Sequence, residues 1–589
     1  MTAAPTPERE AETIEVLSAR YGAARYRWLV VSACLAGALG MVLSSVSMNV
    51  AVPSVMGAFG VGQDQAQWIA TGYLATMVIG MLLNAWLIAA LGQRLTFLVI
   101  VAVFLVGSAI GATSTSIDML IVARIMQGIP AGVMQPFSMM VNFQVFPPER
   151  RGTAMGIFGM GVVLAPVFGP LLGGIAIDTL GWRYIFAMPL PFIAVSLVLG
   201  SLFLPERAQK GPFPPFDWTG LALLATALAL ILSGLTSGQR LGWTSDAVIG
   251  RLALGSIIVA AFVWWERRAK RPLLDFTLFR NPRFACAMAV SFIFGVCMFG
   301  SSYVVPVFAQ TVQGYTAMRA GWLLALGGSI MVFMFPLSGR VSDTLPPQWL
   351  ILSGLVTFAI GFILMHRVDV NVGFFLMAGL SAFTRIGLSW VLTPLNATSL
   401  RYVPPEKLAS ASSNANFFRQ LGGGMGIAVL VAVLETRTAF HATALTATQT
   451  PANSTSAETL GMVASMLAPT GLPDGTAQNY AITFLGQIVH ANAYMFGFQD
   501  VFLVLGLVTL AATIPAWFVR RPKPATVLAT APTLVSARPP APSTDTDRAE
   551  HAPPLPPPLS KRPLQPRPVR RTGMLKRRAQ SRRARRLMR

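Results

Sequence analysis

The chain has 589 residues, 54% of them hydrophobic and only 12% charged, and its mean hydropathy is +0.60. Soluble domains carry about a quarter of their residues as charged side chains, so this composition excludes a soluble protein and indicates a polytopic membrane protein. The net charge of +22 does not indicate a nucleic-acid partner, because thirteen lysines and arginines gather between Lys561 and Arg589, where no acid occurs. The three cysteines all fall in apolar runs, so we expect neither a disulfide framework nor a metal site.

Apolar runs along the chain predict fourteen transmembrane helices, and hence an all-α membrane protein. The first run begins at about Trp28 and is too long for the apolar core of a cleaved signal peptide, so we expect it to be retained as a span. The predicted spans are 28–52, 66–91, 95–115, 118–143, 153–177, 183–204, 218–236, 248–265, 285–308, 319–338, 349–366, 372–396, 411–434 and 499–519.

The basic residues between the predicted spans indicate the orientation of the chain. Residues such as Arg94, Arg150, Arg340 and Lys407 fall on one side of the membrane, and few lysines or arginines fall on the other. Because the loops richest in Lys and Arg stay inside the cell, this side is predicted to be cytoplasmic. An even number of spans then places both termini in the cytoplasm.

An internal repeat divides the chain into two halves. The segment Pro147–Arg150 follows the fourth predicted span, and the similar segment Pro404–Lys407 follows the twelfth, 257 positions later. This spacing is longer than six spans require and leaves room for two additional helices, so the predicted architecture is six spans, two linking spans and six spans. Repeated helical halves around a central cavity are typical of secondary transporters.

The domain boundaries follow from this organisation. The patterns around Leu460–Leu467 and Ile482–Val489 predict amphipathic helices in an outward segment, and the Pro-, Ala- and Arg-rich C-terminus predicts a disordered tail. The predicted parts are an N-terminal cytoplasmic tail (1–27), an N-terminal six-helix bundle (28–205), a linker with two extra spans (206–284), a C-terminal six-helix bundle (285–519) that includes a periplasmic segment (436–498), and a basic cytoplasmic tail (520–589).

The fifth predicted span carries a glycine-rich pattern. Gly161, Ala165, Gly169 and Gly173 recur every four residues and form a stripe that a neighbouring helix can approach closely. Two prolines each remove a backbone donor and favour a bend. A moving gate and static packing both fit this pattern. The candidate gating residues are Gly161, Pro166, Gly169, Pro170, Gly173 and Gly174.

Several motifs in a fixed order resemble one transporter family. The end of the family's first span is matched by Leu43–Pro53, and its second span is matched by Gln67, Trp68, Thr71 and Tyr73. Its RxxQG motif is matched by Arg124–Gly128, and its GPxxGG antiporter motif is matched by Gly169–Gly174. Its thirteenth span resembles Phe418–Gly423. Over about residues 28–520 the chain resembles the fourteen-span drug:proton antiporters of the EmrB/QacA type in the major facilitator superfamily.

The resemblance implies a major facilitator fold of fourteen transmembrane helices and a bacterial inner-membrane exporter. The substrates would be amphipathic or lipophilic small molecules, including antibiotics, moved by alternating access and coupled to protons. Gram-negative relatives of this type meet a periplasmic adaptor protein of the EmrA type and an outer-membrane channel. Nothing in the chain resembles a nucleotide-phosphate loop, a metal cluster or a catalytic triad, so we expect no enzyme activity, no cofactor and no nucleic-acid partner.

The candidate cavity residues are Ser44, Ser47, Asn49, Tyr73, Arg124, Gln127 and Arg385. A guanidinium in the membrane interior is costly and rarely faces lipid, so Arg124 is the strongest candidate, although a bracing role between helices is the alternative. For Arg385 a functional role and a packing role are both open. Arg419 lies nearer the cytoplasmic end, where its side chain could instead reach the interface.

Two departures from the family pattern concern proton coupling. The family carries an acid in its first span where this chain has Ser44, and another in the loop after the second span where this chain has Ala89. The candidates that remain for coupling are Arg124, Asp178 and Asp343, so coupling is predicted to be weakened or moved away from the first span. The same departures leave two alternatives open: a carrier for a lipid or metabolite that is not driven by the usual carboxylate, or a transporter-like membrane sensor or scaffold.

Overall fold

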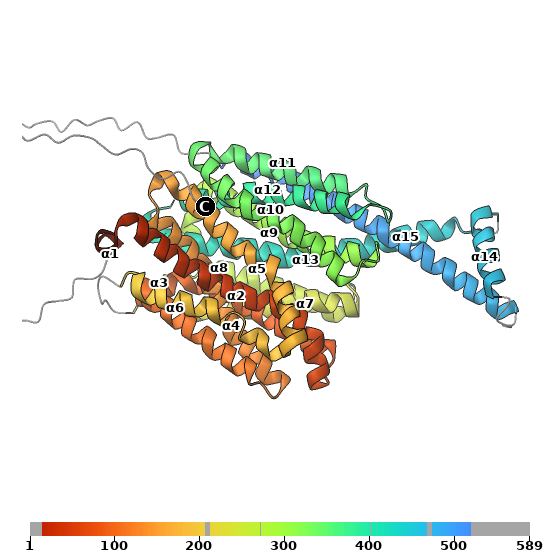
Figure 1. The fold of residues 1–589 in the computed structure, drawn as a ribbon, viewed down its shortest axis with the longest axis horizontal. Helices are drawn as coiled ribbons and strands as arrows, with labels where there is room; N and C mark the ends of the chain where they lie inside the picture. The colour runs from red at the N-terminus through yellow and green to blue at the C-terminus, as the bar shows by residue number, and fades with distance from the viewer. Residues whose placement is uncertain are drawn as a thin grey trace, which may run out of the picture. The chain divides into compact units, whose positions relative to one another are not determined.

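The computed structural model describes residues 14–206, 213–270, 272–401, 403–450, 452–467 and 474–519 (Figure 1). Within these ranges every regular element is helical, which confirms the predicted all-α class. The predicted disordered tail (520–589) and residues 1–13 of the N-terminal tail lie outside the described residues.

The N-terminal half contains six α-helices and two short 3₁₀ helices. They are α1 (Ile14–Tyr21), α2 (Ala23–Phe59), α3 (Gln63–Ala112), α4 (Ile117–Val145), η1 (Pro148–Arg150), α5 (Arg151–Leu180), η2 (Trp182–Phe186) and α6 (Leu190–Phe203). Helix α3 is interrupted at Gly92, whose φ of 79° is a conformation that glycine adopts without strain. This break falls between the two predicted spans 66–91 and 95–115.

Two linker helices and the C-terminal half follow. These elements are α7 (Trp218–Leu241), α8 (Asp246–Glu266), η3 (Phe276–Arg280), α9 (Pro282–Thr311), α10 (Ala317–Thr344), α11 (Pro347–Met365), α12 (Phe374–Arg401), η4 (Pro405–Lys407), α13 (Leu408–Ala447), α14 (Ser454–Leu467), α15 (Asp474–Ala511) and α16 (Thr513–Trp517). The predicted linking spans correspond to α7 and α8.

Twelve helical stretches among the described residues are long and apolar enough to cross a membrane. One of them, Trp68–Ala112, has 45 residues, and at about 1.5 Å per residue it exceeds twice a hydrocarbon core of about 30 Å. Helix α5 is not among the twelve, but it packs between α2 and α10. The total of fourteen spans remains a prediction that these lengths support.

The helices pack as two bundles with the linker hairpin beside them. In the N-terminal bundle α2 contacts α4, α5 and α6, and α3 contacts α4; in the C-terminal bundle α13 contacts α9 and α15, and α12 contacts α10 and α11. The bundles meet where α5 contacts α10 and where α13 contacts α3 and α4. The linker helices α7 and α8 pack together, and α7 also contacts α3 and α13, so the hairpin covers the second of these seams.

The predicted outward segment 436–498 is mostly helical. Helix α13 continues to Ala447, α14 follows, and α15 starts at Asp474, so both predicted segments are helical, although the second belongs to a long apolar helix. In Figure 1 α14 and the first part of α15 project beyond the other helices. The described part of the segment therefore consists mainly of helices, two of which continue from spans.

Candidate functional site

The central polar group of the N-terminal bundle is the guanidinium of Arg124 on α4, which is only 1% exposed. Its Nη1 donates hydrogen bonds to the Gln127 side-chain oxygen at 2.9 Å and to Ser44 Oγ on α2 at 3.4 Å. Its Cζ lies 4.2 Å from the centre of the Tyr73 ring on α3, which is a favourable cation–π distance. Its Nε has no hydrogen-bond partner among the described residues.

The orientation of Gln127 is fixed by a directed chain of hydrogen bonds. Its Nε2 donates to Ser108 Oγ at 2.9 Å, and Ser108 donates to the Phe104 carbonyl at 3.0 Å. Because the amide nitrogen is used as a donor toward α3, the amide oxygen faces Arg124. The predicted residues Ser44, Tyr73, Arg124 and Gln127 therefore form one group.

The glycine of the RxxQG motif explains how this group becomes so compact. A Cβ added to Gly128 would lie 2.0 Å from Thr76 Oγ1 and 2.5 Å from the Tyr73 carbonyl oxygen, and one added to Gly132 would lie 1.9 Å from the Met77 carbonyl oxygen. Helices α3 and α4 can approach this closely only where no side chain intervenes. The motif thus supplies the charge, the residue that orients it, and the space for both.

Ser44 occupies the position where the family carries an acid, and the structure places it against Arg124. The hydroxyl is fully buried and accepts a hydrogen bond, but it supplies no negative charge. None of the described carboxylates forms an ion pair with Arg124. The hydrogen-bond partners of this buried cation within the described ranges are therefore neutral.

Two other predicted cavity residues, Ser47 and Arg385, make their hydrogen bonds outside this group. Ser47 donates to the Gly169 carbonyl at 3.0 Å and joins α2 to α5. Arg385 is in the other bundle, on α12, where it is 7% exposed and donates to Ser302 Oγ on α9 at 3.4 Å. The side chain of Asn49 lies outside the described residues. Arg419 is buried inside α13 and bonds the side chains of Asn396 and Asn416, so it does not extend to the interface.

The small-residue stripe of α5 faces α2 in its own bundle. Added Cβ atoms at Gly161, Gly169 and Gly173 would meet Leu35, Val46 and Ser47 of α2 at 2.6 to 3.2 Å, whereas one at Gly174 would meet nothing within 4 Å. Pro166 is exposed, and the side chain of Pro170 lies outside the described residues. A gating role for these residues remains a prediction.

The contact between the bundles uses a different part of α5, at the end where Arg94, Arg150, Arg340 and Lys407 lie, here named the basic end. The Asp343 carboxylate of α10 accepts hydrogen bonds from the backbone nitrogens of Gly152 and Thr153, at 2.6 and 3.0 Å, and from Thr153 Oγ1 at 2.6 Å. An anion at a helix N-terminus is favoured by the unpaired N–H groups there. Asp343 therefore caps α5 from the opposite bundle.

Glycines allow this approach, and the sequence pattern did not single them out. An added Cβ at Gly156 would lie 2.5 Å from the Phe335 carbonyl oxygen, and one at Gly339 would lie 2.8 Å from the Gly152 carbonyl oxygen. The spacing of Gly152 and Gly156 is the signal in the sequence that could have identified them.

The second seam is also closed toward the basic end. Asn84 of α3 donates to Ser413 of α13 at 3.2 Å, and Asn416 of α13 contacts the sulfur of Met139 on α4 at 3.3 Å. The buried side chains of Asn142 and Asn414 have no hydrogen-bond partners among the described residues. The hydrogen bonds that join the two bundles thus lie near the basic end.

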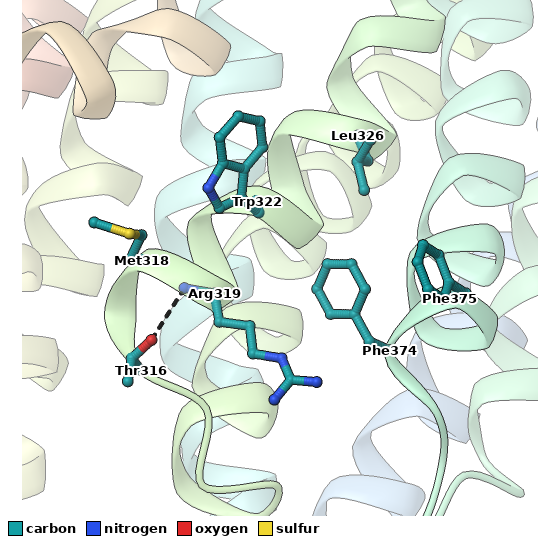
Figure 2. Close-up of a pocket in the computed structure, with 7 residues that line it drawn as sticks. All are labelled: Thr316, Met318, Arg319, Trp322, Leu326, Phe374 and Phe375. Carbon is teal, nitrogen blue, oxygen red and sulfur yellow. Dashed lines mark hydrogen bonds between the residues drawn. The ribbon is translucent and has the colours of Figure 1, made fainter.

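Two cavities lie at the ends of the helices. One, of about 430 Å³, lies at the basic end between the bundles and is lined by residues that include Arg27, Glu149, Arg150 and Arg340. The other, of about 470 Å³, is formed by α10 and α12 and is lined by Thr316, Met318, Arg319, Trp322, Leu326, Phe374 and Phe375 (Figure 2). Arg319 is exposed there among aromatic rings, with its Cζ 4.2 Å from the Tyr315 ring centre.

The outermost candidate for coupling is Asp178, which is exposed in the last turns of α5. Asp343 is engaged at the contact between the bundles, and Arg124 lies within one bundle. The structure therefore does not bring the three candidates for coupling together.

Two helical bundles in contact around buried polar groups indicate a multi-span membrane protein of the secondary-transporter class. The family model of the Major Facilitator Superfamily matches residues 33–427. The chain is 30% identical over 488 residues to the multidrug export protein EmrB of Escherichia coli (strain K12), covering 82% of this chain and 93% of that protein. It is 30% identical over 485 residues to the fatty acid resistance protein FarB of Neisseria gonorrhoeae, covering 81% and 94%.

Solved structures show the same fold. The human organic anion transporter MFSD10 matches with a TM-score of 0.55 at 14% identity, covering 83% of this chain and 99% of that one. The proton:xylose symporter XylE matches with a TM-score of 0.54 at 14% identity, covering 84% and 96%. The chain belongs to the major facilitator superfamily, and its relatives confirm the predicted resemblance to EmrB-type transporters.

Proposed function

We propose that this protein exports amphipathic or lipophilic small molecules from the cytoplasm by alternating access. The proposal is supported by relatives named for multidrug export, for fatty acid resistance and, at 26% identity over 406 residues in Listeria monocytogenes, for lincomycin resistance. The observation that carries it is the contact between Asp343 and the start of α5, because hydrogen bonds across two rigid bundles can break and re-form without unfolding either.

The proposal includes the bacterial inner membrane as location, with both termini in the cytoplasm, and proton coupling by resemblance to the family. It also includes a periplasmic adaptor of the EmrA type that would bind the projecting helices α14 and α15. The absence of acids at positions 44 and 89 favours a second candidate function, which is a carrier for a lipid or metabolite whose transport is not driven by the usual first-span carboxylate.

The test compares a strain that lacks this protein with the same strain carrying it, against a panel of amphipathic compounds, with and without a proton uncoupler. An exporter lowers the accumulation of some compounds. The uncoupler dissipates both the pH gradient and the membrane potential, so loss of the effect indicates energised export, and a carrier without coupling keeps the effect under an imposed substrate gradient. Unchanged accumulation of every compound would instead support the sensor or scaffold alternative.

A further inference from the structure

The interiors of the two bundles hold three arginines that form no ion pair with any carboxylate of the described residues. Arg124, Arg385 and Arg419 are 1%, 7% and 7% exposed. Among the described residues the buried acid is Glu266, which ends the linker helix α8 and accepts a hydrogen bond from the Leu274 backbone nitrogen. No described carboxylate forms an ion pair with any of the three arginines.

Ionised side chains inside a membrane are costly and usually pair with one another or with backbone carbonyls. The neighbours of Arg124 are a hydroxyl, an amide oxygen and an aromatic ring, and its Nε is unpartnered. Such groups orient a guanidinium, but they do not cancel its charge. Because arginine stays protonated in proteins, the charge is not removed by titration. No described carboxylate supplies the counter-charge, so a bound anion is a species that would supply it.

We infer that the substrate of this exporter is an anionic amphiphile, and that its acidic head group binds the Arg124 guanidinium in place of the carboxylate that the first span lacks. The inference rests on the proposed export function and specifies its substrate class. The guanidinium offers its donors in a planar fork that fits carboxylates, sulfonates and phosphates. Arg124 is buried in the state that the structure shows, so the head group would reach it in another state of the transport cycle, where apolar side chains of α2, α3 and α4 would contact the rest of the molecule.

The charge of the substrate also supplies a driving force. Export of a monovalent anion moves negative charge outward, and an inside-negative potential of about 100 mV then supports an accumulation ratio of roughly fifty. The same potential opposes the export of a cation. An anion exporter therefore needs no carboxylate to carry a proton, which accounts for the absence of an acid at position 44.

Ser44 offers a specific test, because its Oγ lies 3.4 Å from Arg124 Nη1. In Ser44→Asp the new carboxylate becomes an internal counter-ion and competes with an anionic substrate. Ser44→Asn places a side chain of nearly the same shape there without the charge. The difference between these two variants therefore isolates charge from size, and Arg124→Gln removes the proposed binding group directly.

The experiment uses the full-length protein in liposomes, with a lumen-positive potential imposed by a potassium gradient and valinomycin and with no pH gradient. The probes are three molecules with one fluorescent aromatic body, ending in a sulfonate, a dimethylsulfonamide or a quaternary ammonium group. A sulfonate stays ionised and carries no proton. Protein-free liposomes give the leak, and thermal melting of each variant verifies that it is folded.

We expect the wild type to transport the sulfonate in proportion to the potential and to prefer it to the ammonium probe. Ser44→Asp should transport the sulfonate at least tenfold more slowly than Ser44→Asn, and its preference should move toward the ammonium probe. Two results would overturn the inference without contradicting the proposed export function. One is an equal sulfonate rate in folded Ser44→Asp and Ser44→Asn, and the other is a wild type that transports the ammonium probe but not the sulfonate. Transport of none of the probes would overturn both.

Discussion

Replacing Asp343 by Asn should release the contact between the bundles at the basic end. The wild-type carboxylate accepts three hydrogen bonds from the start of α5, two of them from backbone nitrogens. Hydrogen bonds to a charged group contribute about 1.5–3 kcal/mol each and are not additive, and the helix N-terminus adds about 0.3–1 kcal/mol. Asn keeps one acceptor oxygen without the charge, so we expect the closed state to lose about 2–3 kcal/mol, which is roughly a 30- to 150-fold shift in population.

The shift can be measured as a distance between spin labels. Leu95 on α3 and Leu345 after α10 are 49% and 48% exposed, belong to different bundles, and lie near the basic end. In a background without the native cysteines, Asp343→Asn should populate a longer distance between labels at these two positions. The control is Asp246→Asn, an exposed acid in the first turn of α8 that does not join the bundles. An unchanged distance distribution in Asp343→Asn, or an equal shift in the control, would refute this account of the contact.

Three further predictions test separate parts of the fold. Gly132→Leu should lower the melting temperature of the protein because its side chain would enter the α3 backbone, whereas Gly174→Ala should melt like the wild type because nothing lies within 4 Å. Burial alone would raise the pKa of the Asp275 carboxyl, but hydrogen bonds from Lys407 and Thr277 outweigh burial and hold the pKa below its usual 3.8. The stabilisation by this pair is therefore present above about pH 4 and is lost as the pH falls through the lower folded-state pKa. Lys407→Met should lower the free energy of unfolding by less than about 1 kcal/mol at neutral pH and should not change it in strong acid, which melting experiments across that pH range would measure. Deleting 445–490 should abolish co-purification of an EmrA-type adaptor while the protein still inserts; retention of the adaptor would show that the projecting helices do not bind it.

The sequence by itself determined the class and the order of the spans. Long apolar runs identify helices because every backbone group inside a bilayer must be paired within the segment, and this physical requirement does not depend on neighbouring helices. The break at Gly92 and the linker helices α7 and α8 were predictable for the same reason. The RxxQG motif likewise identified Arg124 and Gln127 as a local unit, because residues three apart share a face of one helix.

Contacts between distant segments were decided by the tertiary structure alone. Asp343 and Gly152 are 191 positions apart, and no local pattern states that one helix caps the other. The same holds for the contact between Ser44 and Arg124, which are 80 positions apart. Because Ser44 faces Arg124, a serine in place of an acid in one span leaves the charge of an arginine in another span without an ion-pair partner there. The energy of a buried charge depends on every group packed around it, and those groups come from several helices. Local periodicity therefore predicts each helix, while the pairing of its polar groups is fixed only when the bundles assemble.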